Sequence, residues 1–326
     1  MRRLTVDAES WPLAGAFTIS RGSKTEAQVV VVEIRDGVHA GRGECVPYPR
    51  YGESVAGTIA TIESVRAEIE RGMDRAVLQS MLKPGASRNA LDCALWDLEA
   101  KQSGRPAWQI AGLAPPHALV TAYTLSLDTV ENMAAAARAN AQRPLLKLKL
   151  SGPGDLDRVR AVHENAPAAR LIVDANEAWT PAIYAEVAPR LRPLGVEMIE
   201  QPLPAAADDG LAGLQRPIPL CADESCHDVA RLDHVVGKYD AVNIKLDKTG
   251  GLTEALKLAA AARAKGLAIM VGCMVGTSLS MAPAMLVAQN ARWVDLDGPL
   301  LLARDREPGL VFSGSNAEPP LPALWG

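Results

Sequence analysis

Residues 145–176 read LLKLKLSGPGDLDRVRAVHENAPAARLIVDAN, a segment with the pattern of a strand, a helix and a second strand. Apolar segments at 145–150 and 171–175 enclose enough residues for one helix and two loops. The same spacing, about 22 to 27 residues, recurs along the chain beyond residue 116. This repeat is the period of a strand followed by a helix, so it predicts a (β/α) barrel rather than a doubly wound sheet.

The predicted barrel strands are short apolar segments, which lie at 120–127, 145–150, 171–175, 196–199, 219–222, 241–246, 268–271 and 293–296. Roughly 185 residues is lean for eight complete strand–helix units, so we expect a helix to be short or missing. The predicted fold class is α/β, a (β/α)7β-type modified TIM barrel with an N-terminal α+β capping domain.

The first part of the chain follows a different order. Strand-like segments at 4–13, 28–34 and 39–46 come first, and helical patterns at 53–71 and 88–101 follow, which is the α+β order. A stretch with Pro and Gly at 112–116 marks the predicted boundary. We therefore expect a capping domain at 1–115 and a barrel at 116–303. The proline-bearing tail, 304–326, is expected to pack back on the first domain.

The overall composition narrows the range of partners. The chain has 326 residues with 34 basic and 38 acidic side chains, a net charge of −4 without a block of like charge. We therefore expect neither nucleic acid nor a membrane surface as partner. The N-terminus lacks the apolar stretch of a signal peptide, and the longest aliphatic run is far short of a spanning helix. Five scattered cysteines without a CxxC pair suit reduced thiols and a cytoplasmic location.

Acidic side chains end three consecutive predicted strands. In a barrel of this kind the C-terminal strand ends carry the chemistry. Asp174, Glu200 and Asp223 stand at these ends. One such acid alone would be more simply a solvated cap, but three on successive strands favour a site for one hard cation. Carboxylate oxygens with open positions for water and substrate are what Mg²⁺ prefers.

Lysines flank these acids. Lys147 and Lys149 end the second segment and point the same way, because side chains alternate along a strand, and Lys245 ends the sixth. A metal and nearby cations stabilise the ene-diolate that forms when a proton α to a carboxylate is removed. A second lysine and the metal are expected to lower the pKa of the base. Bases on opposite faces of the carbon favour a racemase or epimerase, whereas a single base would suit β-elimination.

The last segment ends with Asp295 and Asp297, two acids on one face. These acids could complete a metal site or bind a substrate ammonium group. We favour the ammonium, because three metal ligands are already supplied. Thr124 in the first segment, and Cys273 and Met274 after the seventh, are further candidate substrate-binding residues.

Several motifs resemble the enolase superfamily: KLK at 147–149, DAN at 174–176, EQP at 200–202, ADES at 222–225 and NIKLDKTGG at 243–251. The lysine after strand six is similar to the muconate-lactonizing subgroup. The mandelate racemase subgroup would have a histidine after strand seven, where this chain has Cys273 and Met274. DLD at 295–297 resembles the DxD element of dipeptide epimerases, and segments 20–26 and 43–53 resemble the capping loops of bacterial L-Ala-D/L-Glu epimerases.

This resemblance implies roles for single residues. It implies Mg²⁺ on Asp174, Glu200 and Asp223, acid/base catalysis by Lys149 and Lys245, and support of the substrate carboxylate by Lys147. It further implies an ammonium site at Asp295 and Asp297, and a basic residue for the glutamate side chain, either Arg21 or Lys24. The implied activity is inversion of the glutamate α-carbon in L-Ala-D/L-Glu by a two-lysine 1,1-proton transfer, as in murein peptide recycling. The sequence leaves the oligomeric state open, with a homo-oligomer as one possibility.

Two alternatives remain open. Another two-lysine member, such as o-succinylbenzoate synthase or a cycloisomerase, is disfavoured by Asp295 and Asp297, because those substrates carry no ammonium group. A catalytically silent protein that binds Mg²⁺ or a peptide is disfavoured by the presence of both Lys149 and Lys245.

Overall fold

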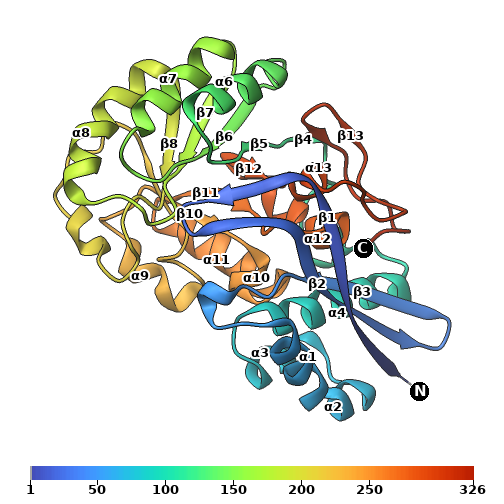
Figure 1. Cartoon of the computed structure of the whole chain (residues 1–326). Helices are drawn as coiled ribbons and strands as arrows, with labels where there is room; N and C mark the ends of the chain where they lie inside the picture. The colour runs from blue at the N-terminus through green and yellow to red at the C-terminus, as the bar shows by residue number, and fades with distance from the viewer. Residues whose placement is uncertain (1) are drawn as a thin grey trace.

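A parallel barrel forms the larger part of the computed structural model, which describes residues 2–326 (Figure 1). Its eight strands follow one another in chain order. They are β5 (Tyr123–Leu125), β6 (Leu145–Lys149), β7 (Arg170–Asp174), β8 (Val196–Glu200), β9 (Leu220–Ala222), β10 (Ala241–Ile244), β11 (Ala268–Gly272) and β12 (Trp293–Asp295). The amide of Ala122 donates to the carbonyl of Val294 at 2.8 Å, so the two ends of the sheet meet. The predicted modified TIM barrel is confirmed.

Two layers of side chains fill the barrel interior. The lower layer is an apolar cluster with one residue from each strand or its start: Ala122, Leu145, Ile172, Met198, Cys221, Ala241, Met270 and Trp293. Because every second side chain along a strand faces the same way, the upper layer lies two residues further along. That layer consists of Thr124, Lys147, Asp174, Glu200, Asp223, Asn243, Gly272 and Asp295. Strand alternation therefore gathers the polar strand ends at one level.

Helices cover the outside of the barrel unevenly. The long ones are α6 (Val130–Ala139), α7 (Asp155–Asn165), α8 (Pro181–Leu191), α11 (Leu252–Ala264) and α12 (Ser278–Ala288). The chain between β8 and β9 forms only the 3-10 helix η3 (Asp208–Leu211). Short helices occur at η2 (Arg192–Leu194), η4 (Val229–Arg231), α9 (Leu232–Val235), α10 (Leu246–Thr249) and α13 (Gly298–Leu301). Short helices after β8, β9 and β12 thus explain how eight strands fit into a barrel of this chain length.

The N-terminal part is an antiparallel sheet backed by helices. Strands β1 (Arg3–Ile19), β2 (Gly22–Asp36) and β3 (His39–Cys45) pair in that order. The helices are η1 (Pro49–Tyr51), α1 (Val55–Ser64), α2 (Arg66–Glu70), α3 (Arg75–Met81), α4 (Ala86–Ser103) and α5 (Ala107–Ile110). Helix α3 was not predicted, and the predicted helix at 53–71 is divided into α1 and α2.

The hairpin of β1 and β2 is longer than the sequence indicated and reaches the barrel (Figure 1). Residues 14–27 lack the apolar alternation of a strand. Their backbones nevertheless continue the hairpin: Ala27 and Glu26 pair with Trp11 and Pro12, and beyond a bulge between Pro12 and Phe17 residues 17–19 pair with residues 22–24. At the far end the Leu127 amide donates to the Thr18 carbonyl at 3.0 Å. The hairpin tip therefore lies against the barrel strand ends.

The first predicted barrel strand, 120–127, was wrong in its bounds. Its beginning forms β4 (Leu119–Val120), which pairs with β14 (Asn316–Ala317), itself paired with β13 (Phe312–Ser313). The break comes where the Thr121 hydroxyl accepts the Leu296 amide at 2.8 Å, which turns the chain from one sheet into the other. Only β5 belongs to the barrel.

The C-terminal tail contacts the N-terminal part. The Trp325 indole donates to the Cys93 carbonyl at 3.0 Å, and the Gly326 amide donates to the Asp97 carboxylate at 2.8 Å. The boundaries at 115 and 303 stay our proposal. Among residues 2–326 no helix combines the length and apolar character that a membrane crossing requires.

Helix α4 packs directly on β3, and two glycines make this possible. A Cβ atom at Gly41 would lie 2.1 Å from the Ala94 carbonyl oxygen, and one at Gly43 would lie 2.1 Å from that of Ala90. We expect Gly41→Ala to lower the free energy of unfolding by about 1–3 kcal/mol through overpacking. Chemical denaturation measures this. Gly15→Ala is the matched control, because nothing lies within 4 Å of its Cβ position, and an equal loss there would contradict the packing argument.

Candidate active site

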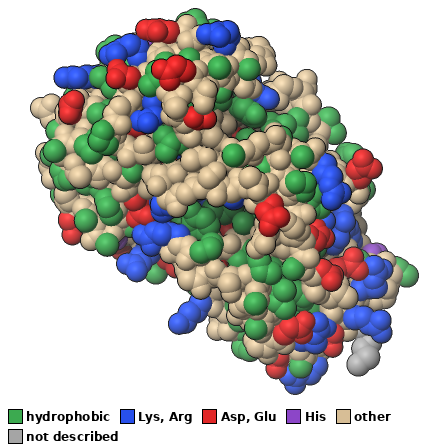
Figure 2. All heavy atoms as spheres, viewed as in Figure 1, with side chains coloured by type: hydrophobic (Ala, Val, Ile, Leu, Met, Phe, Trp, Pro, Cys, Tyr) green, Lys and Arg blue, Asp and Glu red, His purple; other side chains and the backbone are tan. Residues whose placement is uncertain are grey.

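A cavity of about 520 Å³ opens where the hairpin tip meets the barrel strand ends. Of the residues predicted from sequence, those that line it are Arg21, Lys24, Lys149, Asp223, Lys245, Cys273 and Met274. Phe17, Tyr48, Tyr51, Asn176 and Glu224 also line it, and sequence reasoning did not single them out. On the face shown in Figure 2, basic and acidic side chains are interspersed. The concentrated charge lies in the interior beneath this cavity.

Lys147 is the centre of a buried ion cluster below the cavity. Its Nζ lies 2.7 Å from Glu200 Oε2, 2.7 Å from Asp295 Oδ2 and 3.4 Å from Asp174 Oδ2. Lys149 Nζ lies 2.6 Å from the same oxygen of Asp174. The structure thus brings together acids from β7, β8 and β12 with both lysines of β6.

A second pair of lysines holds the remaining acid. Lys245 Nζ lies 2.6 Å from Asp223 Oδ2, and Lys248 Nζ lies 2.6 Å from Asp223 Oδ1. The Asn243 amide donates to Glu200 Oε1 at 2.6 Å. Lys248 and Asn243 were missed by sequence reasoning, although Asn243 stands two residues before Lys245 on the same side of its strand. For Lys248 the sequence carries no such signal, because a lysine after a strand is ordinarily exposed.

Burial and ion pairing shift the pKa values of this cluster in opposite directions. Burial alone would raise the pKa of Asp223, but Lys245 and Lys248 hold it well below its usual range. Burial raises the pKa of Glu200, and Asp174 adds to this effect. Burial alone would lower the pKa of Lys245, but Asp223 and Glu200 raise it above its usual value. The protein groups alone thus favour the charged form of Lys245. The expectation of a base with a lowered pKa includes a bound metal ion and stays a prediction.

The three strand-end acids fit a hard cation. Glu200 Oε2 and Asp223 Oδ1 are buried and lie near lysine amines, yet neither makes a hydrogen bond of proper geometry. Buried carboxylate oxygens without such a bond are uncommon in folded proteins and call for an explanation, such as an ion. Three carboxylates on the neighbouring strands β7, β8 and β9 supply the oxygen set that Mg²⁺ takes.

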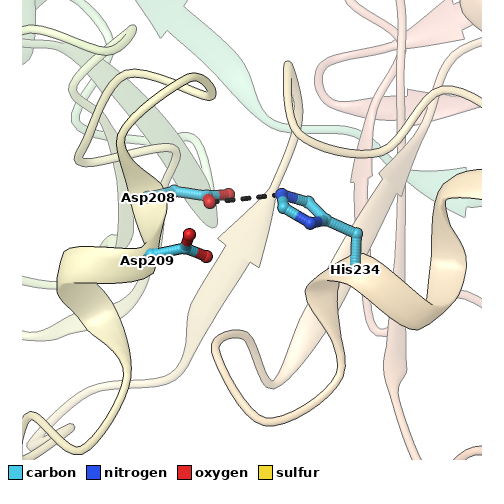
Figure 3. Close-up of side chains that lie close together, drawn as sticks. All are labelled: Asp208, Asp209 and His234. Carbon is cyan, nitrogen blue, oxygen red and sulfur yellow. Dashed lines mark ion pairs between the residues drawn. The ribbon is translucent and has the colours of Figure 1, made fainter.

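A different acidic group lies outside the barrel mouth, where Figure 3 shows Asp208 and Asp209 facing His234. Lys238 Nζ lies 2.6 Å from Asp208 Oδ1, 2.9 Å from Asp209 Oδ1 and 3.0 Å from His234 Nε2. An ammonium group therefore already supplies positive charge to these ligand atoms. We assign no metal to this group.

Asp295 and Asp297 lie deep beside the cavity. Asp297 Oδ2 accepts the Thr124 amide at 2.6 Å, and the side chain is 3% exposed. Burial raises the pKa of Asp297 to about 7, and the neighbouring Asp295 contributes to this. Asp295 is paired with Lys147, while its Oδ1 is buried without a hydrogen bond. Cys273, which lines the cavity wall, lies near both acids.

The structure separates the two candidate cations of the hairpin tip. Arg21 donates to the Asn176 carbonyl and to Glu224 Oε1, both at 2.8 Å, and to the Tyr48 hydroxyl at 3.2 Å. Lys24 lines the cavity and, within residues 2–326, makes no hydrogen bond or ion pair. Burial lowers the pKa of Lys24 to about 8, with Lys149 adding to this and Cys273 opposing it. Arg21 is thus occupied by the protein, whereas Lys24 is available to a ligand.

The backbone turns sharply after two of the acidic strands. Asn176, Glu177 and Gln201 have φ values of 44°, 68° and 33°, in the left-handed region that non-glycine residues rarely adopt. Such conformations cost on the order of 1–3 kcal/mol each and cluster at functional sites. The Gln201 side chain accepts the Asp223 amide at 2.9 Å, so this turn also orients the acid of the next strand.

Known proteins resemble the chain over its whole length. Residues 1–112 match the family "Mandelate racemase / muconate lactonizing enzyme, N-terminal domain", and residues 129–311 match "Enolase C-terminal domain-like". The L-Ala-D/L-Glu epimerase of Escherichia coli (strain K12) is 47% identical over 315 residues, 96% of this chain and 98% of that protein.

Two solved structures are also similar. An enolase family member from Agrobacterium tumefaciens, with bound sodium and L-Ala-L-Glu, has a TM-score of 0.98 and 54% identity and covers 100% of each chain. A dipeptide epimerase from Methylococcus capsulatus, complexed with Mg and L-Arg-D-Lys, has a TM-score of 0.90 and 32% identity, covering 97% of this chain and 96% of its own. The barrel with acids on three successive strand ends, its lysine-bearing neighbours and these matches together show that the chain belongs to the enolase superfamily.

Proposed function

We propose that this protein is a Mg²⁺-dependent L-Ala-D/L-Glu epimerase, which inverts the glutamate α-carbon through an ene-diolate. The observation that carries the proposal is the placement of Lys149 and Lys245, two buried amines that line one cavity, each paired with a strand-end acid. The activity named for the Escherichia coli relative and the L-Ala-L-Glu bound by the Agrobacterium tumefaciens protein support this substrate class.

The two lysines act from opposite sides. Lys149 ends β6 and Lys245 follows β10, and three strands separate β6 from β10 along the sheet in one direction. In a closed eight-stranded barrel that spacing is half the circumference. One neutral amine removes the α-proton and the other, as an ammonium, delivers a proton to the opposite face, so the configuration inverts.

Asp174, Glu200 and Asp223 would hold the metal ion. When bound there, Mg²⁺ stabilises the negative charge of the ene-diolate and, by sharing the carboxylates that raise the pKa of Lys245, favours the neutral amine of a base. Lys147 adds fixed positive charge from below, where it contacts Glu200, Asp295 and Asp174.

The remaining polar groups recognise the dipeptide. Asp295 and Asp297 bind the N-terminal ammonium, and the Thr124 amide orients the Asp297 carboxylate through its hydrogen bond. Lys24 binds the glutamate side-chain carboxylate, because this residue lines the cavity and makes no hydrogen bond or ion pair with the described residues 2–326. Arg21 instead ties the hairpin tip to the barrel loops. Cys273 and Met274 form part of the cavity wall.

Other functions fit these groups less well. A synthase or cycloisomerase of the muconate-lactonizing subgroup has no use for two buried acids at an ammonium site, and a silent binding protein has no use for two opposed lysines. We further propose that the enzyme works in the cytoplasm, in murein peptide recycling. We also propose that the protein binds neither nucleic acid nor a membrane. A homo-oligomer stays a prediction.

The first test is isotope exchange. Incubated with Mg²⁺ and L-Ala-L-Glu in D₂O, the protein should exchange the glutamate α-proton for deuterium and form L-Ala-D-Glu, because solvent protons enter through the lysine that reprotonates the carbon. Proton NMR follows the exchange and chiral chromatography follows the epimer. Absence of both would overturn the proposed function.

Single lysine variants test the two bases. Lys149→Ala and Lys245→Ala should each abolish epimerisation, because one face of the carbon loses its proton donor or acceptor. Each should still exchange the α-proton of one epimer, and the two variants should prefer opposite epimers. The same NMR assay on both epimers measures this. Normal epimerisation by either variant would refute the two-base assignment.

Metal binding can be located by thermal unfolding. Mg²⁺ should raise the Tm of the wild type, by an amount that corresponds to about 2.7 kcal/mol at one hundred times Kd. Glu200→Gln should abolish the rise, because Glu200 Oε2 is one of the buried oxygens without a hydrogen bond. Asp209→Asn is the control from the exposed acidic group and should retain it. The reverse pattern would move the metal to the Asp208 group.

The pH dependence tests Lys24. Its ammonium is charged below a pKa of about 8 and neutral above it, so kcat/KM for L-Ala-L-Glu should fall as the pH rises through 8. Lys24→Arg should remove this fall, because a guanidinium stays charged. Lys24→Met should lower kcat/KM at pH 7 by about 10- to 100-fold. An unchanged alkaline fall in Lys24→Arg would assign it to another group.

A further inference from the structure

Glu44 is a carboxylate that the proposed mechanism does not use, although it is buried between the two parts of the chain. It stands on β3, and its side chain is 0% exposed. Glu44 Oε1 accepts the Thr277 amide at 2.8 Å, and Oε2 accepts the Thr277 hydroxyl. Arg306 donates to the same Oε2 from Nη2 at 2.8 Å and from Nε at 3.0 Å.

The groups around Glu44 come from distant parts of the sequence. Thr277 is the N-cap residue of α12, and Arg306 belongs to the C-terminal tail and also pairs with Glu9 of β1. Burying a carboxylate costs several kcal/mol of desolvation free energy, which its hydrogen bonds and ion pairs must offset. A protein with a well-packed apolar group in the same place would often be as stable. The presence of a charged residue here therefore indicates that Glu44 fixes the position of its neighbours, rather than only stabilising the fold.

Glu44 fixes the barrel loop at 273–277. The first three residues of this loop, Cys273, Met274 and Val275, line the cavity. Its last residue, Thr277, is the one that Glu44 binds. Met274 packs with Val46, the residue that follows the end of β3, and a Cβ atom at Gly276 would lie 3.0 Å from Glu44 Oε1. The loop thus has no room to move towards β3 while Glu44 holds its end.

The same loop supports the ammonium site. A Cβ atom at Gly298 would lie 2.9 Å from the Gly276 carbonyl oxygen, so the two backbones are in direct contact. Gly298 follows Asp297 directly. A continuous path of contacts therefore runs from Glu44 through Thr277 and Gly276 to Asp297.

We propose that Glu44, held by Arg306 and Thr277, is a positioning residue for recognition of the substrate ammonium group, because it sets the loop against which Asp297 is placed. The inference rests on the proposed function, since it assumes that the ligand is a dipeptide with a free amine. Glu44 touches neither substrate nor reacting atoms. Its contribution is to ammonium binding rather than to proton transfer.

Glu44→Gln tests this inference. The variant keeps the shape but loses the charge and one acceptor oxygen, so the loop end is no longer fixed. KM for L-Ala-L-Glu should rise about tenfold while kcat changes less than about twofold, as for loss of a binding interaction. Inhibition by N-acetyl-L-Ala-L-Glu, which lacks the ammonium group, should change less than about twofold. A purely structural role predicts equal losses for both molecules.

Asp97→Asn is the matched control. Asp97 is another fully buried carboxylate of the N-terminal part, and it accepts the amides of Arg42 and Gly326 and the amine of Lys101, each at 2.8 Å. Its loss should lower the Tm without raising KM. Equal KM values for Glu44→Gln and the wild type, or the same KM increase in Asp97→Asn, would overturn the inference. If Glu44→Gln does not fold, Arg306→Lys replaces it, with the same selective KM increase expected.

Separate experiments test the proposed function and the role of Glu44, so that one can fail without the other. Wild-type epimerisation in the D₂O assay tests the first and does not involve Glu44. If the wild type fails to epimerise, calorimetric Kd values of L-Ala-L-Glu and its N-acetyl form for wild type and Glu44→Gln still decide the second. A selective loss for the free amine supports the inference, and an equal or absent loss refutes it.

Discussion

The contact of one ammonium group, Lys147, with carboxylates from three strands depends on the alternation of side chains in the barrel. Eight apolar side chains fill the lower interior, and the residues two positions further along form the layer above. Strand alternation would place side chains of any type at that level. Because the sequence supplies acids and lysines there, the barrel concentrates them into one cluster.

A cluster of buried charges is stable only if opposite charges and hydrogen bonds compensate for the loss of water. Most of the compensation here is internal, since each strand-end acid lies within ion-pair distance of at least one lysine. The compensation is incomplete at Glu200 Oε2 and Asp223 Oδ1. These two oxygens belong to residues at the ends of the neighbouring strands β8 and β9. Because they lack hydrogen bonds, a cation that both carboxylates bind is the physical explanation we expect.

The N-terminal part completes the site from above and from the side. Its long hairpin brings Lys24 over the cavity, while Arg21 on the same tip is tied to barrel loops and is no longer available to a ligand. At the other wall, Glu44 and the tail residue Arg306 hold the loop that carries Cys273. Recognition groups thus come from segments that are distant in sequence, whereas the proposed metal ligands and bases come from successive strands.

The strand period, the barrel class and the level at which Asp174, Glu200 and the lysines of β6 stand could be predicted from the amino-acid sequence, because they follow from local alternation and spacing. It did not reveal the end of the hairpin, where residues 17–19 pair with residues 22–24, because residues 14–27 have no apolar pattern. The sequence did not distinguish Arg21 from Lys24 as the residue for the glutamate side-chain carboxylate. It also gave no signal for Lys248 or for the bond between Glu44 and Arg306. These points became clear only in the folded molecule, because each depends on contacts that the local sequence pattern does not encode.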